Sequence, residues 1–116
     1  MRADSSQRCG AAGELIAAKH LRSLGHEILA QNWRHPSAEL DIVSQTTTHL
    51  VVTEVKTTSA QNYGLERRFS AYARARQRLA AQELAGRLHK QARLDLIEVR
   101  LDLKNARFDL KRLQNL

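Results

Sequence analysis

The sequence predicts an α/β domain in which helices cover a mixed β-sheet. Two observations carry this prediction: one helix-like segment precedes three short strand-like segments, and a second helix-like segment separates these from two final strands. A helix between two strands of one sheet is the usual crossover between parallel neighbours, whereas short turns join antiparallel ones. We therefore expect the order α-β-β-β-α-β-β in one domain spanning residues 1–116.

The first half of the chain contains one predicted helix and three predicted strands. Residues 12–24 (AGELIAAKHLRSL) combine helix formers with apolar side chains at 17, 21 and 24, and Gly25 follows as a C-terminal stop. Residues 1–10 are expected to be a flexible leader. Residues 27–34 (EILAQNWR), 39–44 (ELDIVS) and 50–57 (LVVTEVKT) are typical of strands, and together they predict an antiparallel meander.

The second half begins with a predicted loop at residues 58–66, which lack any periodicity. A long helix is expected over residues 67–93. Its approximate apolar stripe consists of Phe69, Tyr72, Ala73, Ala80, Leu84 and Leu88. Residues 94–103 (LDLIEVRLDL) and 106–113 (ARFDLKRL) predict two strands joined by a tight turn.

Charge is distributed unevenly along this basic chain of net charge +7. Residues 1–60 hold six Lys or Arg and six Asp or Glu, whereas residues 61–116 hold thirteen and six. Because a basic surface attracts polyanions, nucleic acid is the leading partner class, ahead of an acidic protein or an anionic membrane surface. A merely solvated basic surface is the alternative.

The sequence also excludes several classes of protein. No apolar run approaches the roughly 20 residues of a membrane span, and residues 1–10 lack the apolar core of a secretory signal. Cys9 is the only cysteine, which excludes an intramolecular disulfide and a cysteine-based zinc cluster. We expect a cytoplasmic protein without membrane partners.

Three charged residues occupy strand positions where apolar side chains are expected. Glu54 and Lys56 are two residues apart and therefore project from the same face of the strand 50–57. Asp41 stands on the preceding strand, so its carboxylate and that of Glu54 are expected to come close. Two neighbouring carboxylates repel unless one takes a proton or a cation lies between them, and a divalent metal with oxygen ligands, Mg²⁺ or Mn²⁺, resolves the conflict. A plain same-face ion pair of Glu54 with Lys56, and a solvated turn acid at Asp41, are the alternatives.

Glu14 supplies a third candidate carboxylate. On the predicted first helix it shares an angular sector with Ala17, Ala18 and Leu21, the side expected to pack on the sheet. A glutamate on such a face is unusual and points to a role in the site. The alternative is an acid near the helix N-terminus that interacts with the helix dipole.

At these residues the sequence resembles the YraN family of small bacterial proteins. The segments that carry the likeness are GELIAAKHL, ILAQNWRHPSAELDIV, VVTEVKT, RQRLAAQELAGRL and RLDLIEV, within residues 13–101. The resemblance implies a restriction-endonuclease-like three-layer sandwich of the PD-(D/E)XK superfamily, similar to archaeal Holliday junction resolvases. Its helix-one glutamate falls on Glu14, its E-x-D element on Glu39 and Asp41, and its E-V-K element on Glu54 and Lys56.

The sequence departs from the pattern of this family at two positions. Ala38 stands where the family usually has glycine, and Thr58 stands where it usually has arginine. Leu40 takes the place of the proline in the superfamily's name, a common change. Because the second departure removes a phosphate contact, the resemblance predicts the fold more firmly than efficient catalysis.

The activity implied by the resemblance is metal-dependent hydrolysis of nucleic-acid phosphodiester bonds, with branched DNA as one substrate class. Asp41, Glu54 and the Val55 carbonyl would hold Mg²⁺ or Mn²⁺, which lowers the pKa of bound water. Lys56 would orient the attacking water or stabilise developing charge, and Glu14 would bind a second metal or a water on it. Cleavage of junctions would suit a homodimer.

Basic residues are expected along one rim of this site. We assign phosphate contacts to Arg67, Arg68, Arg74 and Arg76. Two rival functions stay open: a non-catalytic nucleic-acid-binding module that retains the nuclease fold, and a protein-interaction domain whose basic face meets an acidic partner.

Overall fold

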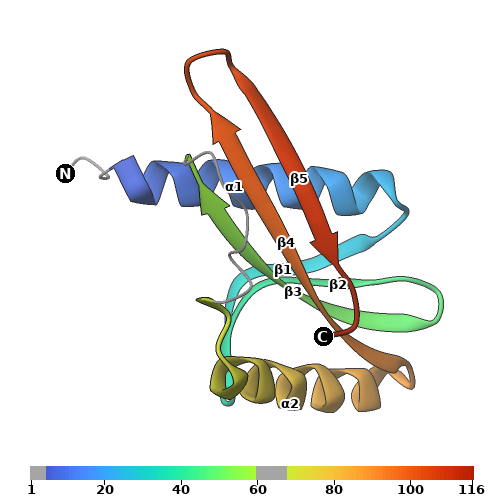
Figure 1. Ribbon diagram of the computed structural model, residues 1–116. Coiled ribbons are helices and arrows are strands. Elements are labelled where there is room, and N and C mark those ends of the chain that lie inside the picture. The colour runs from blue at the N-terminus through green and yellow to red at the C-terminus, as the bar shows by residue number, and fades with distance from the viewer. Residues whose placement is uncertain (1–4, 60–67) are drawn as a thin grey trace.

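Two helices and five strands form in residues 5–59 and 68–116, the part of the chain that this computed structural model describes (Figure 1). They are, in chain order, α1 (Ser5–Ser23), β1 (Glu27–His35), β2 (Ala38–Gln45), β3 (His49–Thr58), α2 (Ala71–Leu88), β4 (Gln91–Asp102) and β5 (Arg107–Leu113). The sheet order is β1-β2-β3-β4-β5. Strands β3 and β4 are parallel and the other neighbours are antiparallel. The predicted α/β class with a five-stranded mixed sheet is therefore confirmed.

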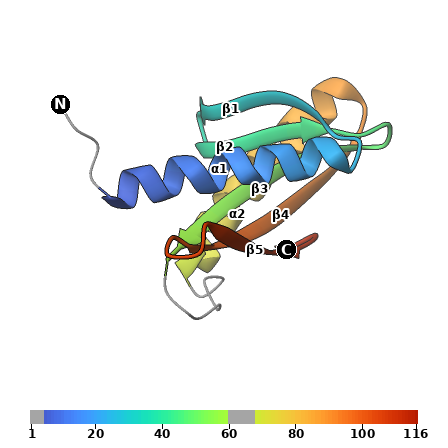
Figure 2. The same ribbon diagram turned by 90° about the horizontal axis from the view of Figure 1, so that it is seen from above.

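The two helices lie on opposite faces of the sheet (Figure 2). The core on the α1 side contains Ala17, Ala18, Leu21, Ile42, Val55, Ile97, Val99 and Leu101. The core on the α2 side contains Leu40, Val43, Leu50, Val52, Phe69, Ala80, Ala81, Ala85, Leu94 and Leu96. Strand β3 contributes to both, because it is a central strand covered on both faces.

Helix α1 begins earlier than the predicted residue 12. Residues 5–10 are helical, so the helix extends into the segment that was expected to form a leader. The helix extends because Cys9 and Ala12 continue its inward face and pack against the α1-side core. It ends where expected: Gly25 has a φ of 90°, and the N–H of His26 bonds to the carbonyl of Leu21 at 3.0 Å.

Helix α2 is shorter than the predicted 67–93. Its start is capped by Ser70, whose hydroxyl accepts a hydrogen bond from the backbone N–H of Ala73 at 3.1 Å. Its end is set by His89, which has a left-handed φ of 55°. No glycine or proline follows directly at this end, so the sequence predicted a helix that continues too far. Residues 91–93 belong to β4 instead.

The predicted apolar stripe of α2 is only partly correct. Tyr72 and Leu88 are exposed, whereas the buried residues of this helix are Gln77, Ala80, Ala81 and Ala85. Three of these four are alanines, which allow the helix to lie close to the sheet. The fourth is a polar side chain directed at the sheet.

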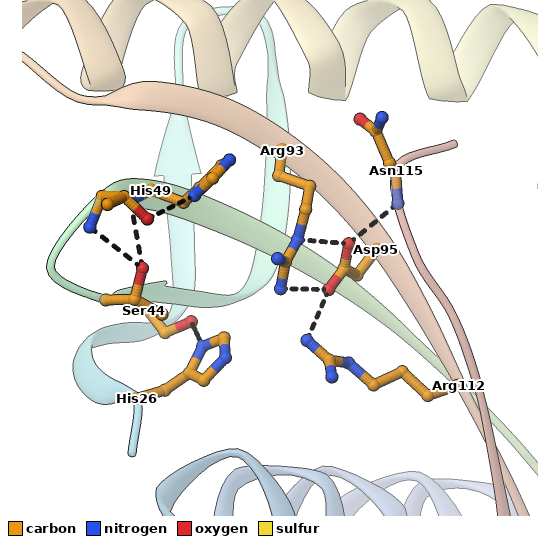
Figure 3. A network of polar contacts seen from close by, with 9 residues as sticks. His26, Ser44, His49, Arg93, Asp95, Arg112 and Asn115 are labelled. Atoms are coloured by element: carbon orange, nitrogen blue, oxygen red, sulfur yellow. Dashed lines mark hydrogen bonds and ion pairs between the residues drawn. The ribbon is translucent and has the colours of Figure 1, made fainter. Parts of the chain in front are cut away.

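A buried polar network fixes the end of the chain to β4 (Figure 3). Asp95 has no exposed surface and accepts hydrogen bonds from Arg93 and Arg112 at 3.0 to 3.1 Å. The backbone N–H of Asn115 donates to the same carboxylate at 3.0 Å. Burial of this charge is tolerated because two guanidinium groups compensate it.

Neither helix in the described residues has the length and apolar character needed to cross a membrane.

Candidate functional site

The antiparallel register of β2 and β3 brings Asp41 to Glu54. The paired residues run from Gln45–Leu50 to Ile42–Thr53, and Asp41 and Glu54 are the next residues along each strand. Their carboxyl groups are close enough for Glu54 to act directly on the acidity of Asp41. The backbone N–H of Val55 also donates to Asp41 Oδ2 at 2.8 Å. The two strands therefore hold one carboxyl group against the other.

This arrangement changes the acidity of Asp41. Burial, the hydrogen bond with Glu54 and the negative charge of Glu54 together raise the pKa of Asp41 to about 8. The N–H of Val55 and the positive charge of Lys56 oppose this rise. At neutral pH the pair therefore keeps a proton on Asp41, as expected for two carboxyl groups without a cation between them.

Glu54 and Lys56 share the α2 side of β3 with Leu50 and Val52. Lys56 is half-buried and stands beside Glu98 in the parallel register with β4. The side chain of Glu98 is fully buried, so this face of the sheet carries a further carboxyl group next to Lys56. The sequence analysis did not assign Glu98 to the site.

Glu14 is placed near β1 by the packing of α1. Asn32 donates a hydrogen bond from Nδ2 to Glu14 Oε2 at 3.0 Å. Within the described residues, no three His, Cys, Asp or Glu side chains are grouped closely enough to hold a metal ion. The structure thus brings Asp41 and Glu54 together but does not add Glu14 to them as a third ligand.

The predicted phosphate-binding arginines have different surroundings. Arg68 is exposed, and Arg67 lies outside the described residues. Arg74 donates to the carbonyl of Phe69 at 2.8 Å and its guanidinium lies over that ring. Arg76 lies over the ring of Tyr72, with 5.5 Å between the guanidinium carbon and the ring centroid. Arg74 therefore supports the start of α2, while Arg68 and Arg76 are better placed for a partner.

Two residues that the sequence analysis missed contact the candidate carboxylates. Gln77 of α2 donates from Nε2 to Glu54 Oε2 at 2.6 Å. Asn32 of β1 contacts Glu14. The residues on either side of Asn32 pair with Leu40 and Ile42 of β2, so Asn32 lies opposite Asp41. Its φ of 50° is rare for a residue with a side chain. The one sequence signal for Gln77 was its spacing of three, four and eight residues from Ala80, Ala81 and Ala85, which places it on the same side of the helix.

Fold and site together define a small α/β protein with a paired carboxylate at the end of a strand ladder. The chain belongs to the uncharacterised protein family UPF0102, whose model matches residues 13–109. The predicted likeness to YraN-like proteins is confirmed at the level of this family.

The chain is similar to UPF0102 proteins of several bacteria. It is 43% identical over 94 residues to one from Frankia casuarinae, a match that covers 78% of this chain and 80% of the relative. It is 39% identical over 98 residues to one from Symbiobacterium thermophilum, covering 81% and 83%. A third, from Parafrankia, is 52% identical over 59 residues, and there the match spans only 51% of this chain and 50% of the relative.

Proposed function

We propose that this protein is a metal-dependent endonuclease of the PD-(D/E)XK type that hydrolyses phosphodiester bonds in DNA. The observation that carries the proposal is the contact of the Asp41 and Glu54 carboxyl groups, with Lys56 two residues from Glu54 on the same strand face. A mixed sheet with one helix on each face supports a restriction-endonuclease-like fold. Strongly shifted pKa values cluster at functional sites, and the pKa of Asp41 is raised to about 8.

The donor set fits a hard divalent cation. Asp41 and Glu54 offer carboxylate oxygens from neighbouring strands, and the Val55 carbonyl would be a third oxygen ligand for Mg²⁺ or Mn²⁺. Bound there, the cation would lower the pKa of water and neutralise negative charge on the phosphate. The contact that now leaves a proton on Asp41 would then become favourable, because both carboxylates would face a positive charge.

The remaining residues of the site have separate tasks. Lys56 would orient the attacking water or stabilise the charge that develops on the phosphate, since a compact ammonium on a central strand needs no rearrangement. Glu14, held by Asn32, would act as a ligand of a second cation or as an acceptor for water at the edge of the site.

DNA is the proposed substrate because the excess positive charge of the chain follows residue 60. Arg68 precedes α2, and Arg76 is the neighbour of Gln77, which reaches Glu54 from that helix, so we assign both to the basic rim. Arg67 and Arg74 stay sequence-based candidates for phosphate contacts, although the Arg74 guanidinium is engaged with Phe69. Branched DNA would suit a homodimer in the cytoplasm, with one site for each of two strands.

A non-catalytic nucleic-acid-binding module is the second candidate function. Thr58 favours it, because arginine in this place would offer a charged, bidentate phosphate contact that threonine cannot make. Ala38 at the start of β2 is the other departure from the family pattern. Such a module would bind DNA through the basic residues without using the acidic pair.

A cleavage assay separates the two functions. The full chain is incubated with duplex, single-stranded, flap and four-way-junction DNA in Mg²⁺ or Mn²⁺. We expect metal-dependent cleavage of at least one substrate by the wild type, loss of cleavage in Glu54→Gln, and retention in the control Glu27→Gln on the exposed part of β1. Binding of DNA without cleavage in either metal would replace the nuclease with the binding module.

A further inference from the structure

Gln77 is the one polar residue among the buried side chains of α2. It is 5% exposed, and the alanines at 80, 81 and 85 continue its side of the helix. These small residues let α2 lie close to the sheet, so the longer glutamine side chain reaches β3. A leucine or methionine would fill the same space without a polar atom, which makes the choice of an amide here a feature to explain.

Of the two polar atoms in the Gln77 amide, one has a hydrogen-bond partner and the other has none in the described part of the chain. Its Nε2 donates to Glu54 Oε2 at 2.6 Å, an orientation that a carboxylate acceptor requires. Its Oε1 is buried and has no hydrogen-bond partner in the described part of the chain. Buried amide oxygens nearly always have a donor, so the missing donor points to a molecule that enters the site.

We propose that Gln77 is a positioning residue that fixes the carboxylate of Glu54 for divalent-cation binding and accepts, through Oε1, a hydrogen bond from a water in the site. This inference rests on the proposed function. Because one oxygen of Glu54 is tied to α2, its carboxylate loses rotational freedom before the cation arrives. Partners that orient a ligand in this way change metal affinity by about 10- to 100-fold when they are removed.

A comparison of two helix variants tests the inference. Gln77→Met removes both polar ends at nearly constant volume, and Gln82→Met is the matched control on the exposed side of α2. For each protein we would measure the melting temperature without metal, the Mn²⁺ affinity by calorimetry, and kcat and KM for DNA cleavage. We expect Gln77→Met to bind Mn²⁺ roughly 10-fold more weakly and to lose kcat with little change in KM, while Gln82→Met behaves as wild type.

The outcomes distinguish this inference from the proposed function. If the wild type binds Mn²⁺ and Gln77→Met binds it within twofold of the wild type, Gln77 has only a structural role and the inference is overturned. If the wild type binds no Mn²⁺, the proposed function fails and the inference fails with it. Should Gln77→Met not fold, Gln77→Asn keeps the amide but is too short to reach Glu54, and the same Mn²⁺ comparison decides.

Discussion

Asp41 and Glu54 are brought together by neighbouring antiparallel strands, so that each carboxyl group acts on the other. The N–H of Val55 holds one oxygen of Asp41 in this position. Burial and the neighbouring Glu54 carboxyl group raise the pKa of Asp41 to about 8. The protonation of one residue is therefore coupled to the folding and to the cation binding of the site.

Without metal, the raised pKa of Asp41 makes stability depend on pH. Below about pH 4 the group is protonated in both the folded and unfolded states, so it contributes no penalty. As the pH rises to about 8, the unfolded chain loses this proton while the folded chain keeps it, so the contribution of Asp41 to stability declines and then levels off. We expect Asp41→Asn to melt higher than the wild type at pH 8 by roughly 4 °C or more, which corresponds to about 1 kcal/mol in a domain of this size.

Thermal melts of both proteins in chelator from pH 4 to pH 9 measure this effect. The difference between them isolates Asp41, because His26, whose pKa burial lowers, is common to both. A difference in melting temperature that stays constant across this range would contradict the shifted acidity.

Lys56→Ala separates metal binding from catalysis. The variant should lose cleavage, because no ammonium is left to orient water or to stabilise the phosphate. Its Mg²⁺ affinity should stay equal or increase, since a positive charge that acts on Asp41 is gone. Calorimetric titration with Mg²⁺ and a cleavage assay measure the two properties on the same preparation. Weaker Mg²⁺ binding in the variant would assign Lys56 to the support of the acidic pair instead.

The basic rim is tested with Arg68 and Arg76 replaced together by glutamine. If both contact phosphates, DNA affinity should fall nearly independently of sequence. The slope of log K against log salt should become shallower by about 1.8, about 0.9 for each duplex phosphate contact. Arg87→Gln is the control, because Arg87 is exposed at the other end of the same helix and pairs with Glu83. If the wild type, the double variant and Arg87→Gln had equal salt slopes, Arg68 and Arg76 would not contact DNA phosphates.

Gly13 is required for the close approach of α1 to β3. A Cβ at this position would lie 1.9 Å from Oγ1 of Thr57, so Gly13→Ala must push the helix or the strand aside. We expect a loss of about 1–3 kcal/mol of stability together with weaker metal binding, because Glu14 and Lys56 adjoin the two contacting residues. Gly10→Ala in the same helix has open space and should stabilise the protein by about 0.5–1 kcal/mol. Chemical denaturation of both variants gives the comparison, and equal effects would show that α1 does not need this contact.

The sequence predicted most of the strands because they have a strong local signal. The alternation in residues 50–57 identified β3 and placed Glu54 and Lys56 on one face, and the meander placed Asp41 beside Glu54. The helix ends were less predictable, since Cys9 and Ala12 extend α1 through tertiary packing and His89 ends α2 in a conformation that glycine usually adopts. Gln77 could not be assigned from periodicity, because its role depends on the distance between α2 and β3.

The site of Glu14 shows a second limit of sequence patterns. Helical spacing places it on the inward side of α1 but does not fix how far along the sheet it falls. In the structure it reaches Asn32 of β1, whose left-handed backbone asparagine adopts more readily than most residues but which no strand pattern locates. The acidic pair was therefore predictable from two strands, whereas the third carboxylate depended on how α1 packs.

The most direct test of the central claim is the melting temperature of the metal-free protein at pH 8 with and without added Mg²⁺ or Mn²⁺. If Asp41 and Glu54 form a cation site, a metal concentration near 100 times Kd should stabilise the wild type by about 2.7 kcal/mol, or on the order of 10 °C. Glu54→Gln should lose this shift, and Glu27→Gln should keep it. Identical melting of the wild type in chelator, Mg²⁺ and Mn²⁺ would contradict the account.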